Sequence, residues 1–268
     1  MSQSRFRRLH GIGNIIMLLP VLRRLAETSG GRVVLETREE WAHALSALVP
    51  AIEFTDSREP GALDLDEMTR GMSPSAHRTD EFARLLGVEG PFRPEVFSVP
   101  APWREKYRKY TGSVILAPEA GHDARQWPVE YLEKLALQLT GEPLVIIGLD
   151  RCPDLRSDFD LRGELSIEDL VGLLSVGRAL IAMDSGALHL AMSVELPAVA
   201  IFSGIDPDFR IRPSQRVNVL QADMDCSPCN KEETCNGLYP CLARIGPELV
   251  VRKLRELDGL NGREITRV

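Results

Sequence analysis

The chain reads Ala-Leu-Ile-Ala-Met-Asp-Ser-Gly-Ala-Leu-His-Leu-Ala-Met-Ser at residues 179–193. The unbroken apolar run Ala179–Met183 is typical of a strand that is buried on both faces of a parallel sheet. The Asp-Ser-Gly turn after it supplies helix-capping side chains, and a helix is expected to begin at Gly186. The stretch therefore predicts a strand, a turn and a helix, with the turn at the carboxyl end of a buried parallel strand.

The same alternation continues through the C-terminal half of the chain. Short apolar runs alternate with helical patterns, which predicts a parallel sheet with crossover helices and places the chain in the α/β class. Ser166 and Asp169 resemble a capping box, and Pro128 suits the first turn of a helix. Gly186 and Pro247 begin two further helix candidates. The strand candidates are Val114–Ala117, Leu144–Ile147, Phe159–Leu161, Ala179–Met183, Ala198–Phe202 and Val217–Leu220.

The N-terminal half shows a weaker pattern. Ile15–Ala26 is apolar nearly all round and predicts a buried helix. Arg5–Leu9 carries too much charge for an ordinary buried central strand. The other candidates are strands at Val33–Thr37 and Ile52–Thr55 and helices at Trp41–Leu48 and His77–Leu86.

A cluster of prolines separates the two halves. Pro91, Pro94, Pro100 and Pro102 fall close together, and prolines at this density disfavour helices and inner strands. We therefore expect a linker here, with one domain over residues 1–105 and a second over residues 106–268.

Composition excludes several classes of protein. The chain has 268 residues, of which 44% are hydrophobic and 26% are charged, and its net charge is −7. These values suit a globular protein without the basic field of a nucleic-acid-binding one. The run Ile15–Leu22 is shorter than the roughly 20 residues of a membrane helix, and Arg23 and Arg24 follow it where a signal peptide would be cleaved. We expect a cytoplasmic protein with no nucleic-acid partner and at most peripheral membrane association.

A glycine motif, Gly11-Ile12-Gly13-Asn14, lies just before the predicted buried helix. Its glycines allow a ligand to approach the backbone, and a helix N-terminus favours anions. A dinucleotide-binding fingerprint would need a third glycine where Ile16 stands, which disfavours a nicotinamide oxidoreductase. A plain tight turn is the alternative interpretation.

The polar loop between Val114–Ala117 and Pro128 contains Arg125. The carboxyl edge of a parallel sheet is where α/β proteins bind ligands, and an arginine there can hold a phosphate through two hydrogen bonds. A solvated surface arginine is the alternative interpretation.

The turn at residues 184–186 offers a third binding feature. Asp184 or Ser185 can cap the following helix, whose free N–H groups can hold a phosphate. His189 lies four residues after Ser185 and therefore on the same helical face. A serine-hydrolase elbow would need a glycine where Met183 stands. An ordinary capped helix with a packed histidine is the alternative interpretation.

Four cysteines lie close together, at Cys226, Cys229, Cys235 and Cys241. Four thiolates in a turn-rich loop can bind zinc or iron tetrahedrally, and the Cys-x-x-Cys pair suits a metal knuckle. The second pair is spaced more widely than in a zinc ribbon, so disulfides and free thiols stay open as alternatives. Cys152 stands apart, and we assign it no role.

These motifs, in this order, resemble glycosyltransferase family 9, the heptosyltransferases of bacterial lipopolysaccharide. The resemblance covers nearly the whole chain, is patchy between residues 30 and 110, and is most specific in the C-terminal half. It is carried by segments 11–20, 125–128, 161–174, 184–191 and 245–250 together with the cysteine loop.

The resemblance implies two Rossmann-like domains that face each other across a cleft, the type-B glycosyltransferase fold, with a reduced N-terminal domain on the acceptor side. It implies inverting transfer of a sugar from an ADP-sugar to a saccharide or protein acceptor, and heptose is the sugar we expect. It also implies that the transfer needs no catalytic metal. By position, Arg125 would contact the donor phosphates and take part in catalysis. The other donor-binding residues implied are Gly13, Leu165, Ser166, Ile167, Asp184, Ser185, Gly186 and His189, with adenine near Leu165–Ile167.

One departure from the family concerns Asn14. The family's glycine loop usually carries an aspartate there, proposed as the catalytic base, and an amide cannot accept a proton. The resemblance therefore implies Asn14 as the catalytic position but predicts a slow reaction unless another carboxylate serves, with Glu119 as the best substitute. Asn14 could also simply cap its helix. The alternative function is a nucleotide-sugar-binding relative that has lost transfer and acts as a sensor or partner subunit.

Overall fold

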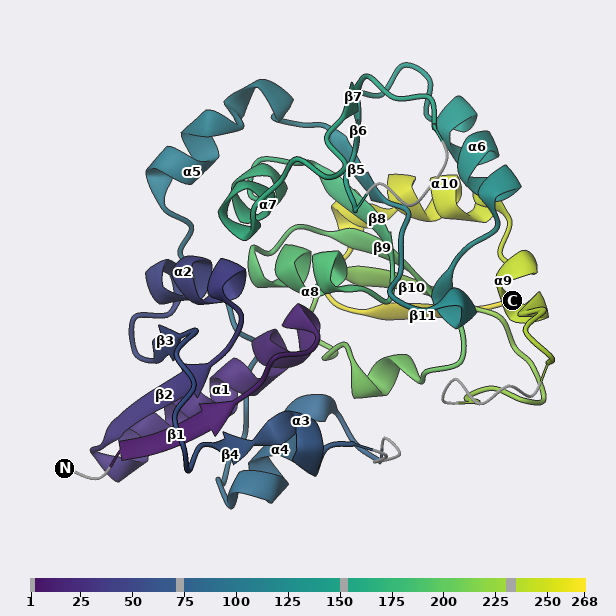
Figure 1. Cartoon of the computed structure of the whole chain (residues 1–268). Coiled ribbons are helices and arrows are strands. Elements are labelled where there is room, and N and C mark those ends of the chain that lie inside the picture. Colours follow the sequence, from purple (N-terminus) through teal and green to yellow (C-terminus); the bar gives the residue numbers. More distant parts are fainter. Residues whose placement is uncertain (1–2, 71–74, 150–153, 230–234) are drawn as a thin grey trace.

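The computed structural model describes residues 3–70, 75–149, 154–229 and 235–268, so Cys152 lies outside the described residues (Figure 1). Every strand pairing that it describes is parallel. The strands form two separate sheets, one from the N-terminal half of the chain and one from the C-terminal half. The expected α/β fold with two Rossmann-like halves is therefore confirmed.

The first sheet contains β1 (Gln3–Arg7), β2 (Arg32–Glu36), β3 (Glu53–Thr55) and β4 (Leu63–Asp64) in the order β3-β2-β1-β4. The chain builds outward from β1 to β3 and then returns to the other side of β1, so the strand order reverses between β1 and β4. This is a shortened doubly wound sheet, in agreement with a reduced N-terminal domain. Its helices are α1 (Ile12–Ser29), α2 (Glu39–Leu48), α3 (Leu65–Met68) and α4 (Arg78–Leu86).

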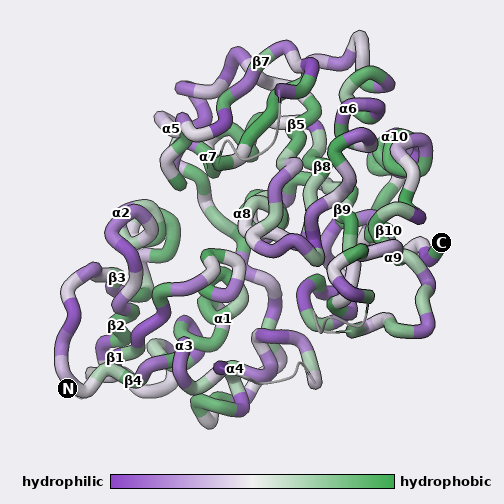
Figure 2. The backbone as a smooth tube through the Cα atoms, turned by 45° about the vertical axis from the view of Figure 1, so that its right-hand side comes forward, coloured by the Kyte–Doolittle hydropathy of each residue, from purple (hydrophilic) through white to green (hydrophobic). Residues whose placement is uncertain are grey.

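The second sheet has the order β11-β10-β9-β8-β5-β6-β7 and reverses between β5 and β8. Its strands are β5 (Val114–Ala117), β6 (Leu144–Ile146), β7 (Phe159–Asp160), β8 (Ala179–Met183), β9 (Ala198–Phe202), β10 (Val217–Gln221) and β11 (Glu264–Arg267). Its helices are α6 (Val129–Gln138), α7 (Ile167–Leu174), α8 (Gly186–Ser193), α9 (Pro240–Ala243) and α10 (Pro247–Arg255). Figure 2 shows hydrophobic residues along α1 and along the strands around β5 and β9. The buried core lies at these elements.

The expectation that Arg5–Leu9 is too charged for a central strand is wrong. β1 pairs with both β2 and β4. Glu36 on β2 is fully buried, and its two carboxylate oxygens accept hydrogen bonds from Nε of Arg5 at 2.9 Å and from Nε of Arg7 at 2.8 Å. A buried carboxylate thus compensates both arginines, which a hydrophobic-pattern rule cannot anticipate.

The proline cluster is only partly a linker. Helix α5 (Ala101–Lys106) begins directly after Pro100, and Pro102 lies in its first turn, where proline costs no hydrogen bond. The division between residues 105 and 106 falls within this helix and stays a prediction. Pro128 precedes α6 as its N-cap and is not its first residue, whereas Ser166 caps α7 as expected by accepting a hydrogen bond from the backbone N–H of Asp169.

The two halves meet where α1 packs against α8. A Cβ atom on Gly13 would lie 2.5 Å from Cδ2 of His189, and one on Gly186 would lie 2.5 Å from Cγ2 of Ile12. Each helix therefore needs a glycine at the point where the other approaches. Both helices begin at the carboxyl edges of their sheets, so this contact brings the two edges face to face (Figure 1).

Among the described residues, no helix is long and apolar enough to cross a membrane.

Candidate functional site

A cavity of about 320 Å³ lies at the carboxyl edge of the second sheet. It lies beside the ends of β5, β6 and β8, which include the place where the strand order reverses. Doubly wound sheets bind their ligands at such a reversal, because the flanking loops diverge there and leave a crevice. Four of the predicted donor-binding residues line the cavity, namely Leu165, Ile167, Ser185 and Gly186.

One end of the cavity presents unpaired hydrogen-bond donors within the described part of the chain. Helix α8 begins at Gly186, and the side chain of Ser185 makes no capping hydrogen bond to it. The Ser185 hydroxyl is buried and has no hydrogen-bond partner among the described residues. Free N–H groups and a buried hydroxyl at one helix N-terminus provide several donors for a phosphate.

Arg125 lies beside this end but does not line the cavity. Its Nη1 donates to the carbonyl oxygen of Asp184 at 2.5 Å and lies 3.2 Å from the carboxylate of Asp184. Its buried Nε has no hydrogen-bond partner among the described residues, and Nη2 lies 3.7 Å from where a Cβ atom on Gly121 would stand. Arg125 thus fixes the turn before α8 and directs its remaining donors toward the cavity edge. Asp184 is engaged in holding Arg125.

The other end of the cavity is apolar. Leu165, Ile167 and Leu170 form it on the side of α7, while the Ser166 hydroxyl caps α7 and does not line the cavity. Trp41 completes this end from α2, which belongs to the first sheet. The Arg38 guanidinium lies 4.9 Å from the centre of the Trp41 ring, and Arg38 is held by the carbonyl oxygen of Leu9.

Trp41 is not among the site residues predicted from the sequence. Its signal was present: an aromatic residue stands in the first turn of the helix that follows β2, at the carboxyl edge of a parallel sheet. The pairing of this edge with the second sheet could not be read from the sequence. An apolar, partly aromatic chamber next to an anion site suits a nucleobase joined to phosphates.

Gly13 and His189 lie together but outside the cavity. They form the contact between α1 and α8, where burial lowers the pKa of His189 to about 4 and so keeps it neutral at neutral pH. Both residues therefore belong to the contact that joins the two halves of the molecule. Their predicted contact with a donor stays a prediction.

Asn14 occupies the third residue of α1 and does not cap the helix. The N-cap is Gly11, whose φ of 74° favours glycine, and no side chain caps this end among the described residues. The Asn14 amide nitrogen lies 3.0 Å from where a Cβ atom on Gly11 would stand, so it folds back over the loop. Its predicted catalytic role stays untested.

Glu119 lines the cavity, and its carboxylate accepts a hydrogen bond from the N–H of Leu149 at 2.8 Å. It thereby ties the loop after β5 to the loop after β6. The expectation that Glu119 substitutes as a base stays a prediction.

Cys226, Cys229, Cys235 and Cys241 are all free, so no disulfide joins them. Burial raises the pKa of the Cys241 thiol, and the charges of the other three cysteines raise it further, which indicates that the four thiols share one region. Among the described residues, however, no three metal-binding side chains are close enough to hold an ion.

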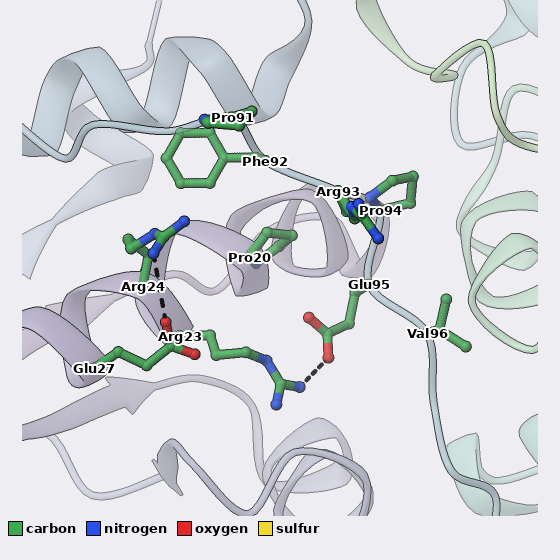
Figure 3. A pocket seen from close by; sticks show the side chains of 10 residues that line it. All are labelled: Pro20, Arg23, Arg24, Glu27, Pro91, Phe92, Arg93, Pro94, Glu95 and Val96. Atoms are coloured by element: carbon green, nitrogen blue, oxygen red, sulfur yellow. Dashed lines mark hydrogen bonds and ion pairs between the residues drawn. The ribbon is translucent and has the colours of Figure 1, made fainter.

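A second hollow, of about 490 Å³, lies between the later part of α1 and segment 91–96 (Figure 3). Arg23 points to the Glu95 carboxylate, and Arg24 points to that of Glu27. No predicted site residue lines this hollow, and we assign it no ligand.

Comparison with known proteins shows which family the sequence matches. The family model "Glycosyltransferase family 9 (heptosyltransferase)" matches residues 77–239. Lipopolysaccharide heptosyltransferase 2 of Salmonella typhimurium is 27% identical over 149 residues, which are 50% of this chain and 43% of that protein. The matched segments cover less than half the length of the curated relatives.

Two solved structures share the fold. A family 9 glycosyl transferase from Veillonella parvula has a TM-score of 0.73 at 16% identity, covering 95% of this chain and 96% of that one. TibC of enterotoxigenic E. coli, a dodecameric iron-containing heptosyltransferase solved in complex with ADP-D-β-D-heptose, has a TM-score of 0.77 at 15% identity. The similarity covers 96% of this chain and 76% of TibC.

Proposed function

This chain belongs to glycosyltransferase family 9, and from that premise we propose that it transfers a sugar from an ADP-sugar to a saccharide or protein acceptor. Heptose is the sugar we propose, because relatives named heptosyltransferases match this chain and TibC was solved with ADP-heptose. The transfer is a single inverting displacement without a catalytic metal. We place the protein in the cytoplasm, with at most peripheral membrane association.

The observation that carries this proposal is the buried, unpartnered Ser185 hydroxyl at the uncapped start of α8. It stands in the same cavity as the apolar chamber of Trp41, Leu165 and Ile167. Phosphates bound at Ser185 would place a nucleobase in the apolar chamber. The sugar would then lie where the two halves of the molecule meet, at the contact between α1 and α8. Arg125 can then neutralise charge that develops on the leaving diphosphate.

Two variants distinguish the two ends of the cavity. Ser185→Ala removes a donor to a charged group, so it should weaken binding of both ADP and inorganic diphosphate about tenfold or more. Trp41→Ala should weaken ADP by roughly 5- to 150-fold, the range for base stacking, and leave inorganic diphosphate unchanged. Isothermal titration with both ligands measures these effects.

Ser193→Ala, at the opposite end of α8, is the matched control and should bind both ligands as the parent does. If Trp41→Ala weakens the binding of ADP and of inorganic diphosphate equally, the apolar chamber does not hold the nucleobase. Transfer is tested by incubating the parent with a panel of nucleotide sugars and measuring nucleotide release and thermal protection. Protection without release would favour the alternative, a binding relative that has lost transfer.

We also propose one structural metal, zinc or iron, at Cys226, Cys229, Cys235 and Cys241. The four free thiols share one region, and TibC is described as iron-containing. The thiols are not drawn together as ligands in the structure, so binding would require the loop to close around the ion. A closed four-thiolate site holds structure and takes no part in transfer.

Protein purified without added metal should contain about one equivalent of zinc or iron by elemental analysis. Cys226→Ser should lower this content and the melting temperature together. Less than about a tenth of an equivalent, with all thiols titratable, would contradict the metal site.

A further inference from the structure

We propose that His10, oriented by Asp66, is the general base that activates the acceptor hydroxyl. The inference rests on the proposed sugar transfer and names the group that receives the acceptor proton. It also accounts for a family 9 chain that carries Asn14 where a base is expected.

His10 and Asp66 meet at the reversal of strand order in the first sheet. His10 lies in the loop after β1, and Asp66 lies in α3 directly after β4, the neighbour of β1. A strand-order reversal is where doubly wound sheets bind ligands. The second sheet holds the donor cavity at its own reversal, so each sheet presents functional groups at the corresponding place.

The packing of α1 on α8 brings these two places together. Ile12 lines the donor cavity and contacts Gly186, the first residue of α8. His10 precedes Ile12 by two residues, so their Cα atoms are at most about 7 Å apart. His10 does not itself line the donor cavity, but its backbone lies close to the Ile12 wall of that cavity, on the side of the first sheet.

The geometry of the pair suits a base with an orienting partner. Nδ1 of His10 lies 3.2 Å from Oδ2 of Asp66, and the His10 side chain is 73% exposed. Asp66 itself is fixed: Oδ2 accepts the N–H of Leu9 at 2.6 Å, and Oδ1 lies 3.3 Å from Nε of Arg8. With Nδ1–H directed at Asp66, Nε2 is the ring nitrogen left to receive a proton.

The proposed step balances in atoms and charge. The acceptor hydroxyl gives its proton to Nε2 of His10 while its oxygen forms a bond to the anomeric carbon of the sugar. The bond from that carbon to the diphosphate oxygen breaks, and ADP leaves with the electron pair. Asp66 stabilises the imidazolium that forms, as a carboxylate behind a catalytic histidine does.

Other candidates fit this role less well. Asn14 cannot accept a proton. Glu119 is bound to the N–H of Leu149, and Asp66 is mostly buried and already holds Leu9, Arg8 and His10.

The test compares two nucleophiles with ADP-heptose as donor. Water must lose a proton to attack, whereas azide needs no base. His10→Ala should lower water-dependent release of ADP by about 10²–10⁴-fold, the range of general-base catalysis. With azide as the nucleophile, the variant should release ADP at a rate within about threefold of that of the parent. Free imidazole should restore part of the variant's rate with water. Asp66→Asn should lower kcat with little change in KM.

His43 provides a matched control, since its Nδ1 lies 2.5 Å from Glu168 and its side chain is also exposed, but it lies on α2 and not in the loop between β1 and α1. His43→Ala should react with water as the parent does. If His10→Ala releases ADP with water as fast as the parent does, His10 is not the base. The same conclusion follows if the variant loses as much rate with azide as it loses with water. A parent that binds ADP but releases none from ADP-sugars overturns the proposed transfer and the base together.

Discussion

Replacing Glu36 with glutamine is expected to lower the free energy of unfolding by about 3 kcal/mol. Removing one partner of a buried charge pair typically costs about 3–5 kcal/mol, because the opposite charge stays buried and uncompensated. Here the lower end applies, since the side chains of Arg5 and Arg7 are 14% and 23% exposed and keep some contact with water. Both arginines lie on β1, one of the two inner strands of the first sheet, so the loss acts on the whole N-terminal half.

Chemical denaturation followed by circular dichroism measures this effect, with Glu59→Gln as the control. Glu59 pairs with the same arginine, Nη2 of Arg5 lying 2.8 Å from Oε1, but its side chain is 59% exposed. An exposed ion pair is worth about 0–1 kcal/mol. If Glu36→Gln is no less stable than Glu59→Gln, the buried carboxylate does not hold β1 in place.

The strand β1 also shows where prediction from sequence stops. Strands β5, β8 and β9 could be predicted because each is a run of apolar residues that is buried on both faces of a parallel sheet. β1 was misjudged because its charges are compensated by Glu36, 29 residues beyond Arg7 in the chain. The short strand β4 and the partly exposed edge strand β11 have little hydrophobic pattern to detect.

The residues of the candidate site also divide into those that the sequence predicts and those that it does not. Ser185 and Gly186 could be predicted because they follow the buried strand β8 and begin α8, whereas Leu165 and Ile167 were expected from the family resemblance alone. Trp41, which lines the cavity, and His10, which we propose as the base, are not predicted from the sequence, because both depend on how the first sheet faces the second. Gly13 is predicted from the sequence as a donor-binding glycine, and the structure places it against His189. Its contact with a donor stays a prediction.

The largest expected gain comes from Asn14→Asp in a chain that lacks His10. In the His10→Ala background, this change should raise water-dependent release of ADP from ADP-heptose by about 10²–10⁴-fold, the range for a restored base. Both residues flank Gly11, since His10 precedes it and the Asn14 side chain folds back over it. A carboxylate at position 14 can therefore serve the same hydroxyl. In the parent, where His10 is present, Asn14→Asp should change the rate by less than about threefold.

Asn14→Ala in the His10→Ala background is the control for this gain, because it removes the amide without supplying a base. All of these variants should fold, since Asn14 does not cap α1 and a negative charge in the first turn of a helix is favourable. A tenfold or greater gain from Asn14→Asp in the parent, with no loss in His10→Ala, would place the base function at position 14 instead. Gain confined to the His10→Ala background is the result that only a shared catalytic role predicts, because a purely structural effect at position 14 would act equally in both.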